Sequence, residues 1–213
     1  MLREPSRTRG IDSFNRMLDA GEELFLDGGA NHLKLNLIIE KSESSTGSFY
    51  ARFGDMNGYL NALHNRALQR TEEQLFEVIQ KAAAEENVFD ILNSYLLELT
   101  KVLHRYKGTF YFFAVGNSQV QSFREDGSRF ALAAQDNLMN LLRPYLSKPS
   151  APEVTRRLDI LARLVAAMGF QQIMFEQKEI SVVKLSDKAF ARELALILSE
   201  SLTPFLNKSK TSD

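Results

Sequence analysis

The chain contains no cysteine, so disulfide bonds and thiolate metal sites are excluded. No apolar run approaches the roughly 18 residues that a membrane-spanning helix needs, so we expect no membrane partner. The first residues, MLREPSRTRG, lack the apolar stretch of a secretory signal peptide. These absences predict a cytoplasmic protein.

An excess of charge of one sign is also missing. The net charge is −1 over 213 residues, so a site for nucleic acid would have to be local. Catalytic patterns are absent as well: His32, His64 and His104 lie far apart, and no zinc-protease, nucleophile-elbow or phosphate-loop motif occurs. We therefore predict that the chain is not an enzyme, and we expect neither a cofactor nor a metal site.

The patterns that are present are helical. Apolar residues from Phe14 to Phe25 recur at spacings of three and four, which predicts a helix of about 14 residues. Asp12 and Ser13 are candidate N-caps for it, and Gly28 with the following glycine is a stop signal.

Two short helices are expected next, over about 31–41 and 45–53, separated by the polar turn 42–44. A long amphipathic pattern then follows Gly54. The β-branched segment 180–185 has no partner strand, so we interpret it as a loop. The fold class predicted for the whole chain is all-α.

Two short helices joined by a tight turn form a helix-turn-helix pattern, in which the second helix enters the major groove of DNA. Phe49 and Phe53 would anchor that helix, and Gly47 would let its backbone approach the duplex closely. The candidate DNA contacts are Lys34, Ser45, Thr46, Gly47, Ser48, Tyr50 and Arg52. An equally open interpretation is that the serines only cap and turn the chain.

Residues 13–60 carry a resemblance to a known family. The segments MLDAGEELFLDGG, IIE and STGSFYARF resemble the N-terminal domain of the TetR family of transcriptional regulators. The chain departs from the family in the turn, where Ser42-Glu43-Ser44 replaces Ala-Gly-Val and so removes a glycine suited to left-handed backbone. An alternative is therefore a degenerate TetR-like protein that no longer reads DNA and binds a small molecule or a protein instead.

The resemblance implies two domains. Residues 1–55 would be the helix-turn-helix domain, with a flexible arm over residues 1–10 that carries three arginines and one glutamate. Residues 56–213 would form a helical domain for effector binding and dimerisation, because the patterns near 154–168 and 190–205 are apolar on more than one face. The resemblance thus implies a homodimer, acting as a repressor on a palindromic operator in double-stranded DNA.

Aromatic residues and methionines of the second domain suggest the effector. They could line an apolar pocket with a few polar groups, which would favour a hydrophobic or aromatic small molecule. The candidate ligand-binding residues are Phe110, Phe113, Gln135, Met139, Phe170 and Met174. The alternative is that these side chains are ordinary core.

Overall fold

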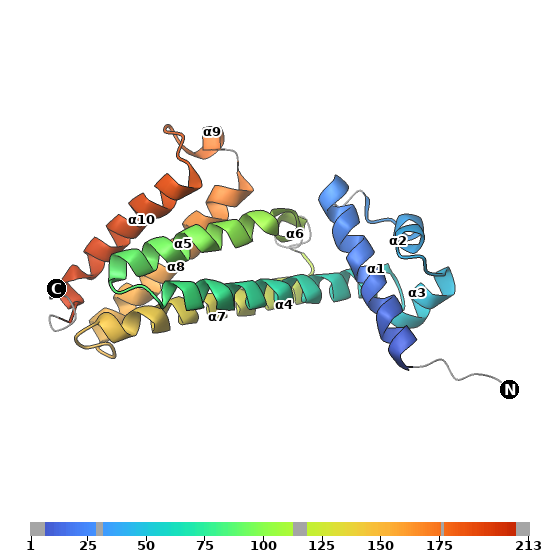
Figure 1. The fold of residues 1–213 in the computed structure, drawn as a ribbon, viewed down its shortest axis with the longest axis horizontal. Coiled ribbons are helices and arrows are strands. Elements are labelled where there is room, and N and C mark those ends of the chain that lie inside the picture. Colours follow the sequence, from blue (N-terminus) through green and yellow to red (C-terminus); the bar gives the residue numbers. More distant parts are fainter. Residues whose placement is uncertain (1–6, 29–31, 113–118, 176, 208–213) are drawn as a thin grey trace. The chain divides into compact units, whose positions relative to one another are not determined.

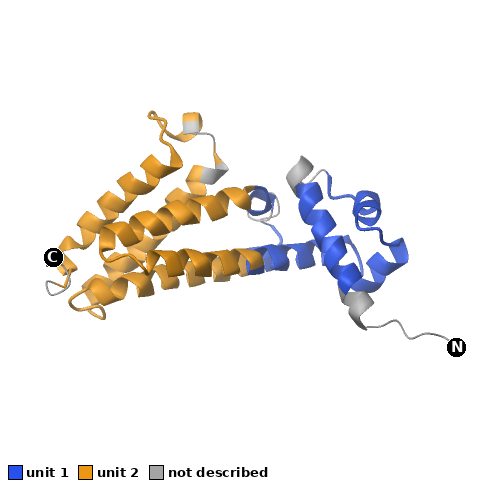
Figure 2. Cartoon of the chain, in the orientation of Figure 1, with its two compact units in different colours: residues 1–69, 108–124 blue, residues 70–107, 125–213 orange. Residues whose placement is uncertain are grey.

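The computed structural model describes residues 7–28, 32–112, 119–175 and 177–207. These residues form helices and connecting loops, with no strand among them, which confirms the predicted all-α class (Figure 1). The chain divides into two compact units, residues 1–69 with 108–124, and residues 70–107 with 125–213 (Figure 2). No helix in the described ranges has the length and apolar character to cross a membrane.

Unit 1 contains the N-terminal helices. They are α1 (Arg7–Gly28), α2 (Leu35–Lys41), α3 (Thr46–Phe53) and the first part of α4 (Met56–Ala82), joined from later in the chain by α6 (Lys107–Phe110) without its first residue. The domain boundary predicted at residue 55 falls at the start of α4, whereas the compact unit follows α4 as far as Gln69.

Unit 2 contains the remainder of α4 and the later helices. They are α5 (Val88–Arg105), α7 (Gln121–Leu142, most of which lies here), η3 (Arg143–Tyr145), α8 (Pro152–Met174), α9 (Gln177–Ile180), α10 (Asp187–Leu202) and η4 (Thr203–Phe205). Segment 181–186, between α9 and α10, has no regular structure, as the sequence predicts for most of 180–185.

The core of unit 1 is aromatic. Phe49 and Tyr59 are fully or almost fully buried, and their ring centroids lie 5.2 Å apart. Phe53 stacks on Phe14 of α1 at 5.1 Å. Each buried aromatic side chain removes a large apolar area from water, so these rings fix α3 against α1 and α4.

The core of unit 2 is built around α5, which packs against α8 and α10. Apolar residues recur along α5 at helical spacing, so one broad face is buried from Val88 to Val102. Tyr95 lies within this core, and burial raises the pKa of its phenol to about 12. On α10, Ala191 and Ala195 are fully buried, and such small side chains permit close helix packing.

The first helix differs from its prediction. It begins at Arg7, so Asp12 and Ser13 lie inside α1 and do not cap it. Ser13 is buried, because it faces the turn between α2 and α3, and that long-range contact cannot be read from local spacing. The flexible arm predicted for residues 1–10 is also corrected, since residues 7–10 form the start of α1. Residues 1–6 lie outside the described part.

Candidate nucleic-acid interface

The turn between α2 and α3 has a defined helix-ending geometry despite its polar sequence. The Ser44 N–H donates to the Ile39 carbonyl at 3.0 Å, and the Glu43 N–H donates to the Glu40 carbonyl at 3.1 Å. This pair of bonds is the Schellman motif, which places a left-handed residue after the helix. That residue is Glu43, with φ of 50°. The glutamate thus adopts the conformation for which glycine is usually selected.

Polar contacts from α1 hold this turn. The Arg16 Nε donates to the Ser42 carbonyl at 3.2 Å, and the Ser44 hydroxyl donates to the same carbonyl at 3.2 Å. The hydroxyls of Ser13 and Ser44 are 3.5 Å apart. Buried polar groups need hydrogen-bond partners, and α1 provides them for this polar turn. An apolar turn would instead be held to α1 by packing of its side chains.

The third helix begins where the sequence predicts. Ser45 is its N-cap, and the Ser45 hydroxyl accepts a hydrogen bond from the Ser48 N–H at 3.2 Å. Phe49 and Phe53 are buried, so the opposite face of α3 is exposed to solvent. Thr46, Gly47 and the half-exposed Tyr50 lie together on this face, one turn of helix apart.

Gly47 is the most open position of this face. A methyl group built in place of its hydrogen would meet nothing within 4 Å. The glycine is therefore not required by the fold of the chain. Its backbone is accessible to a partner that approaches α3 closely.

The other predicted DNA contacts flank the exposed face. Arg52 folds back along α3, where its guanidinium donates to the Ser48 carbonyl at 3.1 Å and to the Ser48 hydroxyl at 3.2 Å. Lys34 is exposed at the N-cap position of α2 and makes no capping bond there. The second helix starts at Leu35, which is later than the predicted start near residue 31.

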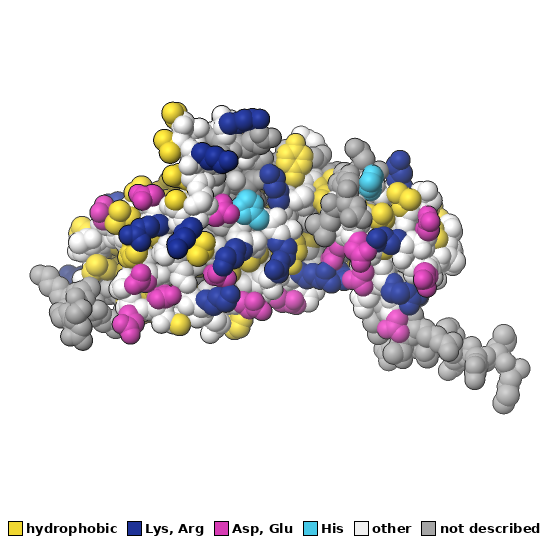
Figure 3. Space-filling view, turned by 45° about the horizontal axis from the view of Figure 1, so that its top comes forward, with side chains coloured by type: hydrophobic (Ala, Val, Ile, Leu, Met, Phe, Trp, Pro, Cys, Tyr) yellow, Lys and Arg dark blue, Asp and Glu magenta, His cyan; other side chains and the backbone are white. Residues whose placement is uncertain are grey.

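Positive charge around α3 is modest. Lys41 forms an ion pair with Glu23 at 2.9 Å, and Arg16 is engaged by the turn. Glu40 and Glu43 are exposed near the same turn. Acidic and basic side chains are interspersed on the face seen in Figure 3.

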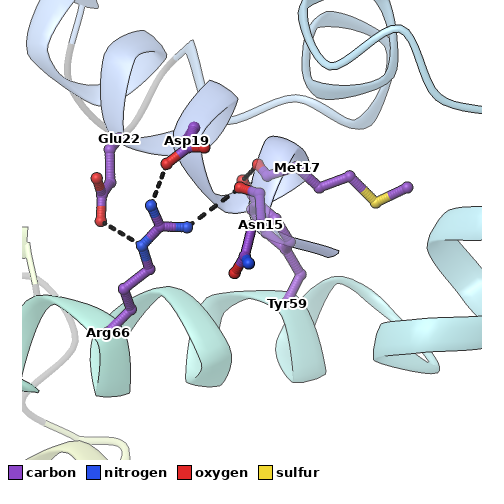
Figure 4. Close-up of polar contacts among 6 residues, drawn as sticks. All are labelled: Asn15, Met17, Asp19, Glu22, Tyr59 and Arg66. Atoms are coloured by element: carbon purple, nitrogen blue, oxygen red, sulfur yellow. Dashed lines mark hydrogen bonds and ion pairs between the residues drawn. The ribbon is translucent and has the colours of Figure 1, made fainter. Parts of the chain in front are cut away.

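A polar cluster joins α4 to α1 within unit 1 (Figure 4). The Arg66 Nη1 donates to the Asn15 carbonyl at 3.1 Å, and the guanidinium pairs with both Asp19 and Glu22, with its Nε 3.3 Å from the Glu22 carboxylate. Charge-assisted contacts of this kind are the stronger hydrogen bonds of proteins. Sequence reasoning missed this cluster, because Arg66 lies more than 40 residues from its partners Asp19 and Glu22.

Tyr59 makes a second polar contact between the same helices. Its buried hydroxyl donates to the Met17 carbonyl at 2.8 Å. Burial, with the neighbouring Glu22 carboxylate, raises the pKa of Tyr59 and keeps the phenol protonated. Gly21 makes room for this side chain, since a Cβ at that position would collide with the Tyr59 hydroxyl.

The predicted ligand-binding residues are distributed between the two units. Gln135 and Met139 lie one turn apart on α7, partly buried, and Met139 packs against the core of unit 2. Phe170 on α8 is partly exposed, and Phe110 lies in α6 of unit 1. Phe113 and the side chain of Met174 lie outside the described part. The effector site thus stays a prediction.

Unit 2 has a different cavity, of about 220 Å³, near the start of α5 and the end of α10. The lining comprises Asn87, Val88, Phe89, Tyr145, Ser199, Glu200, Thr203 and Leu206. None of the predicted ligand-binding residues belongs to this lining. Within the described ranges no three acidic or histidine side chains gather as metal ligands would.

Helices α8 and α10 each expose large apolar side chains. On α8 they include Phe170 and a row of three, Ile160, Leu164 and Met168, which recur every four residues and are 53%, 44% and 36% exposed. On α10 they are Leu196 and Ile197, 44% and 62% exposed. Helices α8 and α10 are thus apolar on more than one face, as the sequence predicts for the patterns near 154–168 and 190–205.

Comparison with solved structures identifies the fold. A TetR-family transcriptional regulator from Mesorhizobium loti aligns with a TM-score of 0.73 and 10% identity, over 93% of this chain and 99% of its own. The TetR-family regulator PfmR from Thermus thermophilus aligns with a TM-score of 0.57 and 16% identity, over 87% and 97%. The TetR-family repressor AlkX from Dietzia aligns with a TM-score of 0.56 and 15% identity, over 90% and 98%.

These comparisons show that the chain has the fold of TetR-family transcriptional regulators along most of its length. The resemblance seen in residues 13–60 is thereby confirmed at the level of the fold. No protein-family model matches the chain, and no curated protein matches its sequence.

Proposed function

We propose that the protein is a DNA-binding transcriptional regulator whose α3 reads the major groove. The observation that carries this proposal is the exposed face of α3, formed by Thr46, Gly47 and Tyr50 and fixed from behind by Phe49 and Phe53. Hydroxyl groups and a phenol can bond to phosphates and base edges, and a glycine lets the helix backbone come close. Lys34, Arg52 and the hydroxyls of α3 complete the contact set.

The regulator acts as a homodimer in this proposal. Exposed apolar side chains on α8 and α10 support it, because two helices that each leave large apolar groups in water gain stability when a second copy covers them. A symmetric dimer presents two α3 helices and so suits a palindromic operator.

Control by a small molecule is a further part of the proposal. A hydrophobic or aromatic effector would bind in unit 2, and α4 runs from unit 2 into unit 1 as one continuous helix. The effector releases DNA only to the extent that it binds the DNA-incompetent state more tightly. Because the effector releases it from DNA, the regulator is a repressor in this proposal. Its proposed location is the cytoplasm.

Selection of bound duplexes from a random DNA pool tests the proposal, with variants at two open glycines as a matched pair. Gly47 on α3 and Gly127 on α7 both have nothing within 4 Å of a built Cβ, so Gly47→Glu and Gly127→Glu should each fold. We expect the wild type and Gly127→Glu to enrich the same palindrome and Gly47→Glu to enrich none. Equal enrichment of the palindrome by both variants would mean that α3 is not part of the DNA interface.

A binding module that no longer reads DNA is the second candidate function. The observation in its favour is the modest positive charge near α3, where Lys41 is paired with Glu23 and Glu43 is exposed. A folded wild-type protein that enriches no duplex at low salt would favour this alternative, since phosphate contacts supply most of the affinity for DNA.

A further inference from the structure

The contacts of Arg66 define where α4 meets α1. Its side chain is only 15% exposed, and its guanidinium engages one carbonyl and two carboxylates of α1. A planar guanidinium with several partners has little freedom to rotate, unlike a single surface ion pair. Arg66 therefore fixes α4 against α1 at this point.

Tyr59 provides a second fixed point on the same face of α4. It lies seven residues before Arg66, which corresponds to about 10 Å along a helix. Two attachment points at this separation restrict how α4 can tilt against α1. If the Arg66 contacts are removed, the hydrogen bond from Tyr59 to Met17 remains as a pivot.

The same stretch of α1 supports α3, the recognition helix of the proposed function. Arg16 and Ser13 contact the turn between α2 and α3, and the partners of Arg66 begin at Asn15. A change in the angle of α1 thus reaches α3 through contacts that all lie within unit 1. Arg66 itself lies on α4 and is not one of the proposed DNA contacts.

We infer that Arg66 is a positioning residue, which sets the angle between α4 and α1 and thereby the separation of the two recognition helices in the dimer. The inference rests on the proposed function, because that separation has meaning only for a dimer that reads two half-sites. It adds a distinct expectation: Arg66 governs the spacing between half-sites and leaves their sequence unchanged.

The spacing of half-sites in selected DNA separates positioning from simple stabilisation. We expect the wild type to enrich a palindrome with one preferred spacing, and Arg66→Met to enrich the same half-site at several spacings. Arg66→Lys, which keeps a positive charge between Asp19 and Glu22, should restore the preferred spacing in part. Arg129→Met is the matched control, because it removes an arginine whose ion pair with Asp126 lies within a single helix.

Hydrogen exchange provides a readout that does not depend on DNA. In Arg66→Met, amides of residues 15–22 should exchange at least about fivefold faster than in Arg129→Met, because their link to α4 is lost. An Arg66→Met protein with the wild-type spacing and unchanged exchange in α1 would overturn the inference. If the wild type enriches no palindrome, the proposed function fails, and the exchange rates alone decide whether Arg66 holds α1.

Discussion

At the scale of single residues, Glu43 is the position where sequence and backbone conflict. A left-handed conformation costs an L-residue other than glycine or asparagine about 1 kcal/mol, because its Cβ approaches the following carbonyl. The Schellman bonds and the contacts from Arg16 and Ser44 hold the turn in this conformation. The polar turn is therefore compatible with a helix-turn-helix at a modest cost in stability.

Replacement of Glu43 should stabilise the protein when the new residue tolerates positive φ. We expect Glu43→Gly to raise the free energy of unfolding by about 1 kcal/mol and Glu43→Asn by a smaller amount. Glu43→Gln removes the charge but keeps the strain, so it should leave stability nearly unchanged. Urea denaturation of the three variants measures this. An equal gain from Glu43→Gln would mean that charge, not backbone strain, is the cost.

At the scale of helices, a three-residue ion cluster links α4 to α5. The Glu98 carboxylate on α5 accepts hydrogen bonds from Lys101 and, at 2.8 Å, from Lys81 of α4. The bond from Lys101, followed by that from Lys81, lowers the pKa of Glu98 below its ordinary value of 4.5. The same contact with Glu98 raises the pKa of Lys81.

These shifts fix the sign of a pH effect. Because the folded-state pKa of Glu98 is lowered, its contribution is present above about pH 4.5 and is lost as the pH falls through the folded-state value. Glu98→Gln should thus be less stable than the wild type at pH 7, by no more than about 1 kcal/mol for such exposed partners. Thermal unfolding at pH values from 7 to 3 should show the difference in stability between Glu98→Gln and the wild type becoming smaller as the pH falls. A difference of constant size would contradict the assignment.

Local spacing explains why some elements could be predicted and others could not. The start of α3 at Ser45 and its buried phenylalanines follow from a capping residue and an i, i+4 apolar pair, both of which are local signals. The start of α1 was missed, because Ser13 packs against a turn 31 residues away and only resembles a cap. Arg66 was missed for the same reason, since its carboxylate partners on α1 are remote in sequence.

At the scale of the whole molecule, the exposed apolar side chains of α8 and α10 predict self-association. We expect Ile160→Glu with Leu164→Glu to weaken the dimer by at least about 2 kcal/mol, because charge is buried where apolar groups would pack. Phe76→Glu on α4 is the control, as Phe76 is 64% exposed and lies on another helix. Sedimentation velocity over a range of concentrations compares them. Greater dissociation from Phe76→Glu would place the interface on α4 instead.

The resemblance in residues 13–60 implied two domains that meet at residue 55, whereas the compact units divide α4 at Gln69 and place residues 108–124 in unit 1. The long helices of unit 2 follow from their apolar periodicity. The effector site could not be fixed in this way, because aromatic side chains such as Phe110 and Phe170 have the same spacing whether they line a pocket or fill a core.

In the proposed interface α3 reads DNA through a close backbone approach at Gly47, and binding by glycine variants tests this approach. The affinity of the selected duplex should be measured against salt concentration for wild type, Gly47→Ala and Gly127→Ala. We predict that wild-type affinity falls steeply with salt, that Gly47→Ala binds at least about tenfold more weakly although alanine favours the helix, and that Gly127→Ala binds like the wild type. Wild-type affinity in Gly47→Ala would mean that the backbone of α3 does not approach DNA closely at Gly47.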